Sequence, residues 1–395
     1  MINRPLKIAL VVSHPIQHFC PQYVSFAENK QIEFKVFFAS TLGFKKYTDP
    51  SFKKEISWNN LNLDQFQHEF LNGEKVIKVD KNIDAISLNT ALDQFSPQLV
   101  IGYGYFQRLQ RRAKKWANKN KIPLAYISDS ELRQPRNKLK ELIKCPFLYH
   151  YFSSVAFFLS VGDSNEMYYR KYGVKNAKIL RMHFPIDLKS YRKAYDNRGA
   201  LNDQIRKQYK IKKNEFVISV VGKMVASKNH DHIIEALIEV EKKNEGVHLF
   251  VVGSGEMEEV LKEKANKLTK SNVHFTGFIS PDELPSYYAA TDLYIHPSLE
   301  DRHPLAVSEA IYMGCPVIIS DTCGSYGPGD DVQDGRNGYV YSFGNTVELA
   351  ERILLLIRNK EARKKQGECS HKIAVDFQDK SHYRILDELA KRINN

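Results

Sequence analysis

The sequence contains 395 residues, of which 43% are apolar and 26% are charged, and this composition excludes a disordered or fibrous chain. The length predicts two or three globular domains. The net charge is +12, and the whole excess lies in the first half: residues 1–200 carry 32 Lys and Arg against 17 Asp and Glu, whereas residues 201–395 carry 26 against 29.

The first half alternates apolar runs with amphipathic or charged stretches. Strands are predicted at residues 7–13, 33–40, 98–102, 123–128 and 156–162, with helical stretches at 105–120 and 163–173. Continuous apolar strands separated by helices indicate a parallel sheet that is covered on both faces. The start of the chain is interpreted as the first strand and not as a signal peptide.

The densest positive charge lies in residues 108–121, where Arg108, Arg111, Arg112 and Lys115 recur at helical spacing. Three interpretations stay open: a solvated helix face, attraction to an anionic membrane leaflet, and nucleic-acid binding. Nucleic acid is an unlikely partner, because no zinc-finger, RNP or helix-turn-helix signature accompanies the charge. The uncharged segment 145–162 is barely long enough to span a bilayer, and a buried helix that runs into a buried strand is the favoured interpretation.

Residues 189–215 are polar and charged, and we place the domain junction there. Beyond it the alternation restarts, with strands predicted at 216–222, 248–253, 273–277, 292–298 and 316–320 and helices between them. This predicts an α/β fold of two doubly wound parallel-sheet, Rossmann-like domains (1–200 and 201–376) that face a central cleft, and residues 377–395 form a last helix that returns to the first domain. The ligand site is expected between the carboxyl ends of the two sheets.

Two groups of residues in the second half suit ligand chemistry. Gly222, Lys223 and Lys228 follow a strand and precede a helix, so the two ammonium groups and the helix N-terminus favour an anion, although two surface lysines would look the same. Asp301 follows a strand, and Glu309 lies eight residues later on an apolar helix. A carboxylate there suits the two hydroxyl donors of a sugar or ribose diol, and a helix N-terminal charge is the alternative.

Together with residues 273–298, these groups resemble the nucleotide-sugar-binding half of glycosyltransferase family 4, whose members have the GT-B fold, over residues 216–345. Residues 7–28 and 157–174 resemble the same family. The resemblance implies that Lys223 and Lys228 neutralise the donor diphosphate and that Asp301 faces the donor sugar. It also implies further donor contacts at Gly222, Phe278 (nucleobase), Glu309 (ribose), His303, Leu305 and Ala306 (backbone amides), and His14 and Gln17 (N-terminal loop).

The chain departs from the family pattern at four places. Asp301 stands where the family has glutamate, and Lys223 stands where it has arginine, which makes a two-pronged phosphate contact that lysine lacks. Pro304 occupies a position that is often glycine and offers no N–H. Residues 100–106 lack the histidine that many relatives place near the reacting sugar.

The resemblance implies retaining transfer of a hexose-like sugar from a nucleotide diphosphate sugar to an acceptor hydroxyl, in bacterial-type surface glycan or glycolipid synthesis. No cofactor is expected, and no metal, because the sequence contains no Asp-x-Asp. The predicted partners are the donor, a glycan or lipid-linked acceptor, and an anionic membrane surface through the basic first half. Five cysteines without a Cys-x-x-Cys pair predict a reducing compartment and therefore a cytoplasmic protein. The basic first half predicts that it lies peripherally on the inner face of the plasma membrane. A nucleotide-sugar epimerase of the same fold and a basic nucleic-acid-binding protein are the alternatives.

Overall fold

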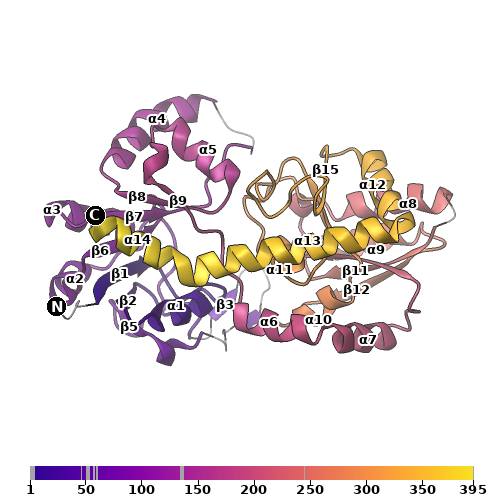
Figure 1. Cartoon of the computed structure of the whole chain (residues 1–395), viewed down its shortest axis with the longest axis horizontal. Coiled ribbons are helices and arrows are strands. Elements are labelled where there is room, and N and C mark those ends of the chain that lie inside the picture. Colours follow the sequence, from indigo (N-terminus) through magenta and orange to yellow (C-terminus); the bar gives the residue numbers. More distant parts are fainter. Residues whose placement is uncertain are drawn as a thin grey trace.

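The computed structural model describes residues 5–45, 47–49, 54–56, 58, 61–133, 138–243 and 245–394 and shows two α/β lobes side by side (Figure 1). The N-terminal lobe holds a seven-stranded sheet in the order β5-β2-β1-β6-β7-β8-β9, and the C-terminal lobe holds a six-stranded sheet in the order β12-β11-β10-β13-β14-β15. All neighbouring strands in these two sheets pair in parallel. The predicted fold of two doubly wound parallel sheets is therefore confirmed.

The strands and helices of the N-terminal lobe follow the apolar runs of the sequence. They are β1 (Leu6–Val12), α1 (Cys20–Ala27), β2 (Ile32–Phe38), the hairpin β3 (Tyr47–Asp49) and β4 (Lys54–Ile56), β5 (Gln67–Phe70), α2 (Leu88–Phe95), β6 (Leu99–Tyr103), α3 (Arg108–Lys119), β7 (Leu124–Ile127), α4 (Lys138–Ser153), β8 (Phe157–Ser160), α5 (Asp163–Lys171) and β9 (Ile179–Arg181).

Successive residues of β1 show why this sheet is covered on both sides. Ala9 and Val11 belong to the core beneath α2 and α3, whereas Leu10 and Val12 belong to the core on the other face, beneath α1. Because side chains alternate along a strand, a central strand with helices on both sides must be apolar throughout. This requirement produces the unbroken apolar runs that made the parallel sheets predictable.

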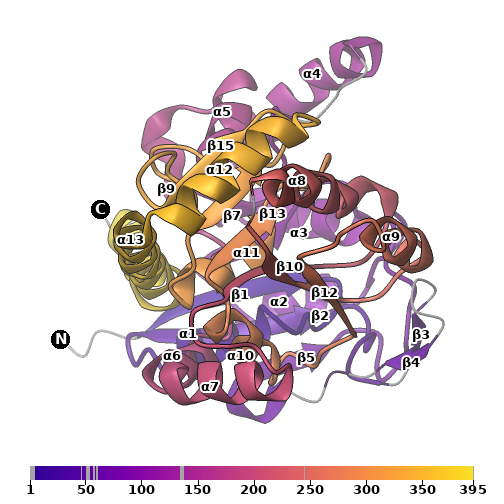
Figure 2. The ribbon, with the colours of Figure 1, turned by 90° about the vertical axis from the view of Figure 1, so that its right-hand side faces the viewer.

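The C-terminal lobe repeats the architecture. Its elements are β10 (Phe216–Val221), α8 (Asp231–Lys242), β11 (Val247–Val252), α9 (Glu258–Ala265), β12 (Asn272–Gly277), α10 (Leu284–Ala289), β13 (Leu293–His296), α11 (Leu305–Tyr312), β14 (Val317–Ser320), β15 (Gly338–Tyr341) and α12 (Thr346–Arg358). Residues 188–208 form α6 (Leu188–Asp196) and α7 (Arg198–Gln208). Figure 2 looks onto this lobe and shows α8 and α12 on one side of the sheet and α7 and α10 on the other.

The C-terminal helices connect the lobes. Helix α13 (Lys360–Asp379) runs along the C-terminal lobe, passes through a π-helical turn (Lys380–Arg384) and continues as α14 (Ile385–Asn394) against the N-terminal lobe (Figure 1). Ile385, Leu386 and Leu389 pack into the same core as Leu10. At the turn, the side-chain amide of Gln22 donates to the Ser381 carbonyl over 2.9 Å. Helix α14 thus packs on the N-terminal lobe.

The apolar segment at residues 145–162 forms the second half of α4 and strand β8. Leu148, Tyr151 and Phe152 are buried, but Phe147 and Tyr149 on the other face of the helix are 46% and 61% exposed. The expectation of a buried helix is therefore wrong for the outward face of α4, which is exposed to solvent and is not covered by another part of the described chain. Within the described parts of the chain, no helix combines the length and apolarity needed to cross a bilayer.

Candidate active site

The two lobes enclose a cleft of about 690 Å³ at the carboxyl ends of their sheets. Of the residues singled out in the sequence, the cleft is lined by Gly222, Lys223, Lys228, Asp301, His303, Leu305 and Ala306. They follow β10 and β13, the two central strands of the C-terminal sheet. Ligands of open α/β sheets bind outside the carboxyl ends of the strands, so the fold places these residues where a ligand is expected.

Glycines shape the floor of this site. The backbone N–H of Gly222 donates to the Val252 carbonyl, and that of Gly253 donates to the Gly277 carbonyl, both over 2.9 Å. Gly253 has a φ of +134°, and a Cβ atom on it would lie 2.0 Å from the Gly222 oxygen. Only glycine fits at position 253, so the ends of β10 and β11 can lie against each other and direct the next loop into the cleft.

The basic loop and the acidic loop are held together by the backbone. The N–H of Leu299 donates to the Ser227 carbonyl over 2.9 Å, which brings the loop after β13 against the short helical turn Ala226–Lys228. As a result the Lys228 ammonium contacts the Asp301 carboxylate directly. The sequence placed both residues at the donor but did not foresee this ion pair.

Asp301 also accepts a hydrogen bond from a buried histidine. His296 Nε2 lies 3.0 Å from Asp301 Oδ2, and the Tyr294 hydroxyl lies 3.3 Å from His296 Nδ1. Burial alone would raise the pKa of Asp301, but His296 and Lys228 outweigh burial and lower the pKa to about 2. Burial lowers the pKa of His296. The site therefore presents an ionised Asp301, held in place by a cation and by a neutral imidazole.

Helix α11 points its N-terminus at the cleft. Leu305 and Ala306, its first two residues, line the cleft, and no side chain caps this end, whose N-cap residue is Pro304. The first N–H groups of a helix lack intrahelical acceptors and attract anions. Lys223, Lys228 and this helix end together offer ammonium groups and N–H donors that suit a polyanion such as a diphosphate.

His303 connects the cleft wall to a buried acidic pair. His303 Nε2 lies 3.3 Å from Asp331 Oδ2, and His303 Nδ1 lies 3.9 Å from Asp330 Oδ1. Burial alone would lower the pKa of His303, but the two carboxylates raise it. This trio has metal-ligand spacing among the described residues, but Asp331 already accepts from Ser308 over 2.7 Å and Asp330 from the Asp163 N–H over 2.8 Å. We interpret it as a buried ion pair within the C-terminal lobe, in which Asp330 also bonds the N-terminal lobe through the Asp163 N–H.

Comparison with known proteins places this geometry in a family. Residues 202–372 match the model of the family described as glycosyl transferases group 1. By sequence, the segment 202–372 is therefore similar to the group 1 glycosyltransferases. Spore coat protein SA of Bacillus subtilis (strain 168) is 25% identical over 233 residues, which are 56% of this chain and 60% of that protein.

A second relative and a solved structure extend the comparison. Poly(glycerol-phosphate) alpha-glucosyltransferase of Bacillus subtilis (strain 168) is 30% identical over 159 residues, covering 40% of this chain and 23% of that protein. The crystal structure of Anabaena HepE in complex with UDP superposes with a TM-score of 0.70 at 16% identity, covering 98% of this chain and all of that one. The chain thus matches about half the length of its curated relatives, whereas its fold matches HepE throughout.

Glu309, which lies within the segment that matches the family model, is not among the described residues that line the cleft. Its carboxylate accepts a hydrogen bond from the Tyr288 hydroxyl over 3.0 Å. Burial raises the pKa of Glu309 to about 7, and the Tyr288 hydrogen bond opposes the rise. The ribose contact of Glu309 stays a prediction. With a pKa of about 7, the Glu309 carboxyl group gains or loses its proton near neutral pH.

Three other predicted donor contacts also lie outside the cleft lining. Phe278 is 57% exposed, and His14 and Gln17 are half-buried. His14 Nδ1 lies 2.9 Å from the Ser13 hydroxyl, and burial lowers its pKa to about 4. The roles of these three residues stay predictions.

The N-terminal lobe contributes cleft residues that the sequence did not single out. They include His18 after β1, Tyr103 at the end of β6 and Asp129 after β7. His18 stands four residues after His14 in the same loop, so the loop was found but the residue was not. The available signal was position: a polar residue after a predicted strand points to the carboxyl edge of the sheet.

Proposed function

We propose that this chain transfers a hexosyl group from a nucleoside diphosphate sugar to an acceptor hydroxyl with retention of anomeric configuration. The observation that supports this most is the polyanion site formed by Lys223, Lys228 and the N-terminus of α11, within a cleft whose other wall is the N-terminal lobe. The family of the C-terminal lobe is consistent with it. The donor would lie on the C-terminal lobe and the acceptor on the N-terminal lobe.

In this reaction the bond between the anomeric carbon and the diphosphate oxygen breaks, and a bond to the acceptor oxygen forms on the same face while the proton of the acceptor hydroxyl passes to the departing diphosphate. Negative charge grows on the departing diphosphate as the sugar becomes positive. Two ammonium groups and the α11 N–H groups, all fixed before the reaction, stabilise that charge. Because the Lys228 ammonium contacts the Asp301 carboxylate, the donor diphosphate would share that ammonium group with Asp301.

For the N-terminal wall we propose that His18, and not His14, contacts the donor sugar. His18 lines the cleft, and burial lowers its pKa to about 4, with a smaller contribution from His14. A neutral imidazole both donates and accepts hydrogen bonds, which suits sugar hydroxyls. This assigns a histidine to the role left vacant at residues 100–106.

The acceptor is proposed to be a glycan or a lipid-linked molecule in surface-polymer or glycolipid synthesis. The relatives that support this include an enzyme named poly(glycerol-phosphate) alpha-glucosyltransferase. Its match to this chain is confined to 40% of the sequence, so it supports the class of reaction and leaves the acceptor to experiment.

The decisive experiment is a screen of UDP-, GDP- and ADP-sugars for thermal stabilisation of the protein, followed by turnover with the donor that binds. We expect one donor class to stabilise the wild type and to lose that effect in Lys223→Ala/Lys228→Ala. The control variant Lys242→Ala/Lys243→Ala changes the same charge at the far end of α8 and should keep the effect.

The products distinguish the alternatives. A glycosyl acceptor product supports the proposal, whereas release of a C2-inverted sugar without any acceptor would assign the chain to epimerases. Stabilisation by no nucleotide sugar, together with salt-sensitive binding to nucleic acid, would contradict both.

A further inference from the structure

Helix α4 carries an unusually exposed apolar face. Leu142 and Ile143 are each 72% exposed, Tyr149 is 61% exposed and Phe147 is 46% exposed. The opposite face of the helix packs into the core through Leu148, Tyr151 and Phe152. Exposed apolar side chains gathered on one element, and not scattered, mark an interaction surface.

The exposed face of α4 is continuous with the basic helix α3. The ring of Phe147 lies 5.8 Å from that of Tyr105, and neighbouring Phe106 is 62% exposed. Arg111 donates to the Phe106 carbonyl over 2.9 Å, and the Lys114 ammonium lies 4.2 Å from the centre of the Tyr151 ring. We call this surface the α3–α4 face, made of Phe106, Leu142, Ile143, Phe147 and Tyr149 together with the exposed cations Arg108, Arg111 and Lys115.

The charge around the α3–α4 face is almost entirely positive. Residues 105–150 contain 12 Lys and Arg and only three acids, Asp129, Glu131 and Glu141. Each acid is occupied elsewhere: Glu141 pairs with Lys171 over 2.6 Å, Asp129 lies 3.4 Å from Arg302 across the cleft, and Glu131 is buried. Arg112, on the same helix as Arg111, is neutralised by Asp84 and does not add to the face.

We propose that the α3–α4 face docks the protein on an anionic phospholipid membrane. Leu142 and Ile143 enter the acyl boundary, and Arg108, Arg111 and Lys115 contact the head groups. Apolar side chains flanked by long cationic ones are the pattern by which a helix binds an anionic interface, because both insertion and charge contribute. An acidic protein partner would pair with the cations but would provide no apolar contact for the exposed side chains of Leu142 and Ile143.

The position of the face agrees with this docking. In Figures 1 and 2, α4 projects from the body of the N-terminal lobe. Along the chain, α4 follows β7 and the cleft residues Ser128 and Asp129. A membrane bound at α4 would therefore lie beside the N-terminal wall of the cleft. Docking does not depend on the proposed transfer reaction and is measured separately.

The test is co-sedimentation of the full chain with phosphatidylcholine vesicles, with and without about 30 mol% phosphatidylglycerol. We expect the wild type to bind only the anionic vesicles. Leu142→Gln/Ile143→Gln and Arg111→Glu/Lys115→Glu should each weaken the partition coefficient about tenfold or more. The melting temperature, and stabilisation by a nucleotide sugar where the wild type shows it, should not change.

Two matched controls separate docking from general effects. Val347→Gln/Leu355→Gln removes exposed apolar side chains from α12, and Lys207→Glu/Lys213→Glu makes the same charge change on the C-terminal lobe. Both should bind as the wild type does. The proposal is overturned if the wild type does not bind anionic vesicles, if the α3–α4 variants bind normally, or if the controls lose as much. It is also overturned if Leu142→Gln/Ile143→Gln abolishes a dimer and not vesicle binding.

Discussion

At the scale of single residues, Lys228 serves the protein in two ways. It faces the cleft, where it would hold the donor diphosphate, and it neutralises Asp301, which is mostly buried behind it. Removing one partner of such a pair leaves an uncompensated charge, which costs more than the pair itself contributes.

This double role predicts a separable pair of effects. Lys228→Ala should lower turnover about a hundredfold and should also lower the stability to unfolding. Adding Asp301→Asn should recover much of the stability, because the uncompensated carboxylate is gone, but should recover no activity. Turnover and chemical unfolding of both variants measure this. Equal stability of the single and double variants would contradict the role of Lys228 as the counter-ion of Asp301.

Glu309 predicts a pH dependence of the opposite sign to that of an ordinary carboxylate. Its pKa is raised from 4.5 to about 7 by burial, so the folded state holds a proton that the unfolded state releases. The contribution of Glu309 to the free energy of unfolding is therefore most favourable below pH 4.5 and declines as the pH rises toward 7. The decline amounts to roughly 2 kcal/mol, because Glu309 is partly accessible to solvent. Glu309→Gln should be more stable than the wild type at about pH 8 and similar at about pH 4.5.

The same carboxylate links stability to the donor. If ribose hydroxyls donate to Glu309, they favour its ionised form, so donor affinity should rise between pH 6 and pH 8 and Glu309→Gln should raise the donor KM about tenfold. The exposed Glu239→Gln is the control. A donor KM that neither Glu309→Gln nor pH alters would remove the ribose assignment while leaving the stability prediction intact.

The residues that were predictable are those with a local motif. Lys223, Lys228 and Asp301 stand at fixed distances from predicted strands, and the structure brings them to one cleft. His18 and Tyr103 have no such pattern, because what places them in the cleft is the docking of the other lobe. The pairing of His296 with Asp301 was missed for a related reason. From sequence alone, a histidine within a strand is interpreted as a core residue, because its hydrogen-bond partner is not known.

At the scale of elements, the strand ends under the site depend on a contact that only glycine permits. A Cβ atom on Gly253 would lie 2.0 Å from the Gly222 oxygen, whereas Gly335, also at positive φ, has open space around it. At both positions an alanine at positive φ destabilises the fold by about 1 kcal/mol. Only in Gly253→Ala must the end of β10 also shift, because the new Cβ atom would clash with the Gly222 oxygen.

We therefore expect Gly335→Ala to lower the free energy of unfolding by about 1 kcal/mol and Gly253→Ala by about 3 kcal/mol or more. Gly253→Ala should also weaken donor binding, because the loop that carries Lys223 follows Gly222 directly. Denaturant unfolding and donor binding of the two variants measure this. Similar losses in both would show that the backbone conformation, and not the close approach, sets the requirement at position 253.

The elements that the sequence predicted best are the buried ones. β1, β10 and β11 are apolar apart from one residue each (Lys7, Ser219 and His248), because both faces of their sheets are covered. Helix α13 was not predicted, because its 20 residues are largely polar and include Gly367. That glycine lets α13 approach α11: a Cβ atom on it would lie 2.5 Å from the Gly314 oxygen. Such a fit depends on the neighbouring helix and leaves no periodic signal in the sequence.

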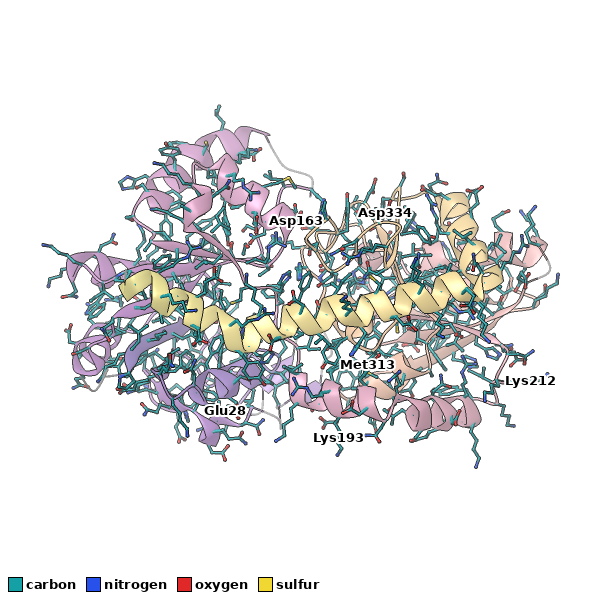
Figure 3. All side chains as sticks on the ribbon, viewed as in Figure 1. Glu28, Asp163, Lys193, Lys212, Met313 and Asp334 are labelled. Carbon is teal, nitrogen blue, oxygen red and sulfur yellow. The ribbon has the colours of Figure 1, made fainter. Side chains whose placement is uncertain are left out.

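At the scale of the whole molecule, the two lobes are held together by polar contacts beside the cleft. The Arg181 guanidinium bonds Asp163 within its own lobe and the Gly329 carbonyl of the other, both over 2.5 Å. Asp163, labelled in Figure 3, lies where the lobes meet, and its N–H donates to Asp330. The partners that meet across the lobes, Arg181 with Gly329 and Asp163 with Asp330, are separated by well over a hundred residues. The sequence therefore predicted two lobes and a cleft but not the contacts that set the distance between them.

Arg133 is well suited to a test of these links, because its guanidinium group donates to backbone carbonyls of the other lobe. It comes from the N-terminal lobe, donates to the carbonyls of Gly324 and Tyr326 over 3.1 and 2.8 Å, and stacks 3.7 Å from the centre of the Tyr326 ring. These acceptors are backbone atoms of the C-terminal lobe, so Arg133 bears on the position of the lobes and not on the donor site.

Arg133→Ala should therefore loosen closure without altering the donor pocket. We expect a larger radius of gyration in solution scattering, unchanged donor affinity, and kcat for transfer lowered about tenfold, with a larger fraction of donor lost to water because the cleft is less well closed. Arg170→Ala, an exposed arginine bonded to Glu166 and Asn176 within the N-terminal lobe, is the control. If Arg133→Ala leaves both the radius of gyration and the ratio of transfer to hydrolysis unchanged, the other contacts between the lobes, including those of Arg181 and Asp330, hold the lobes without Arg133.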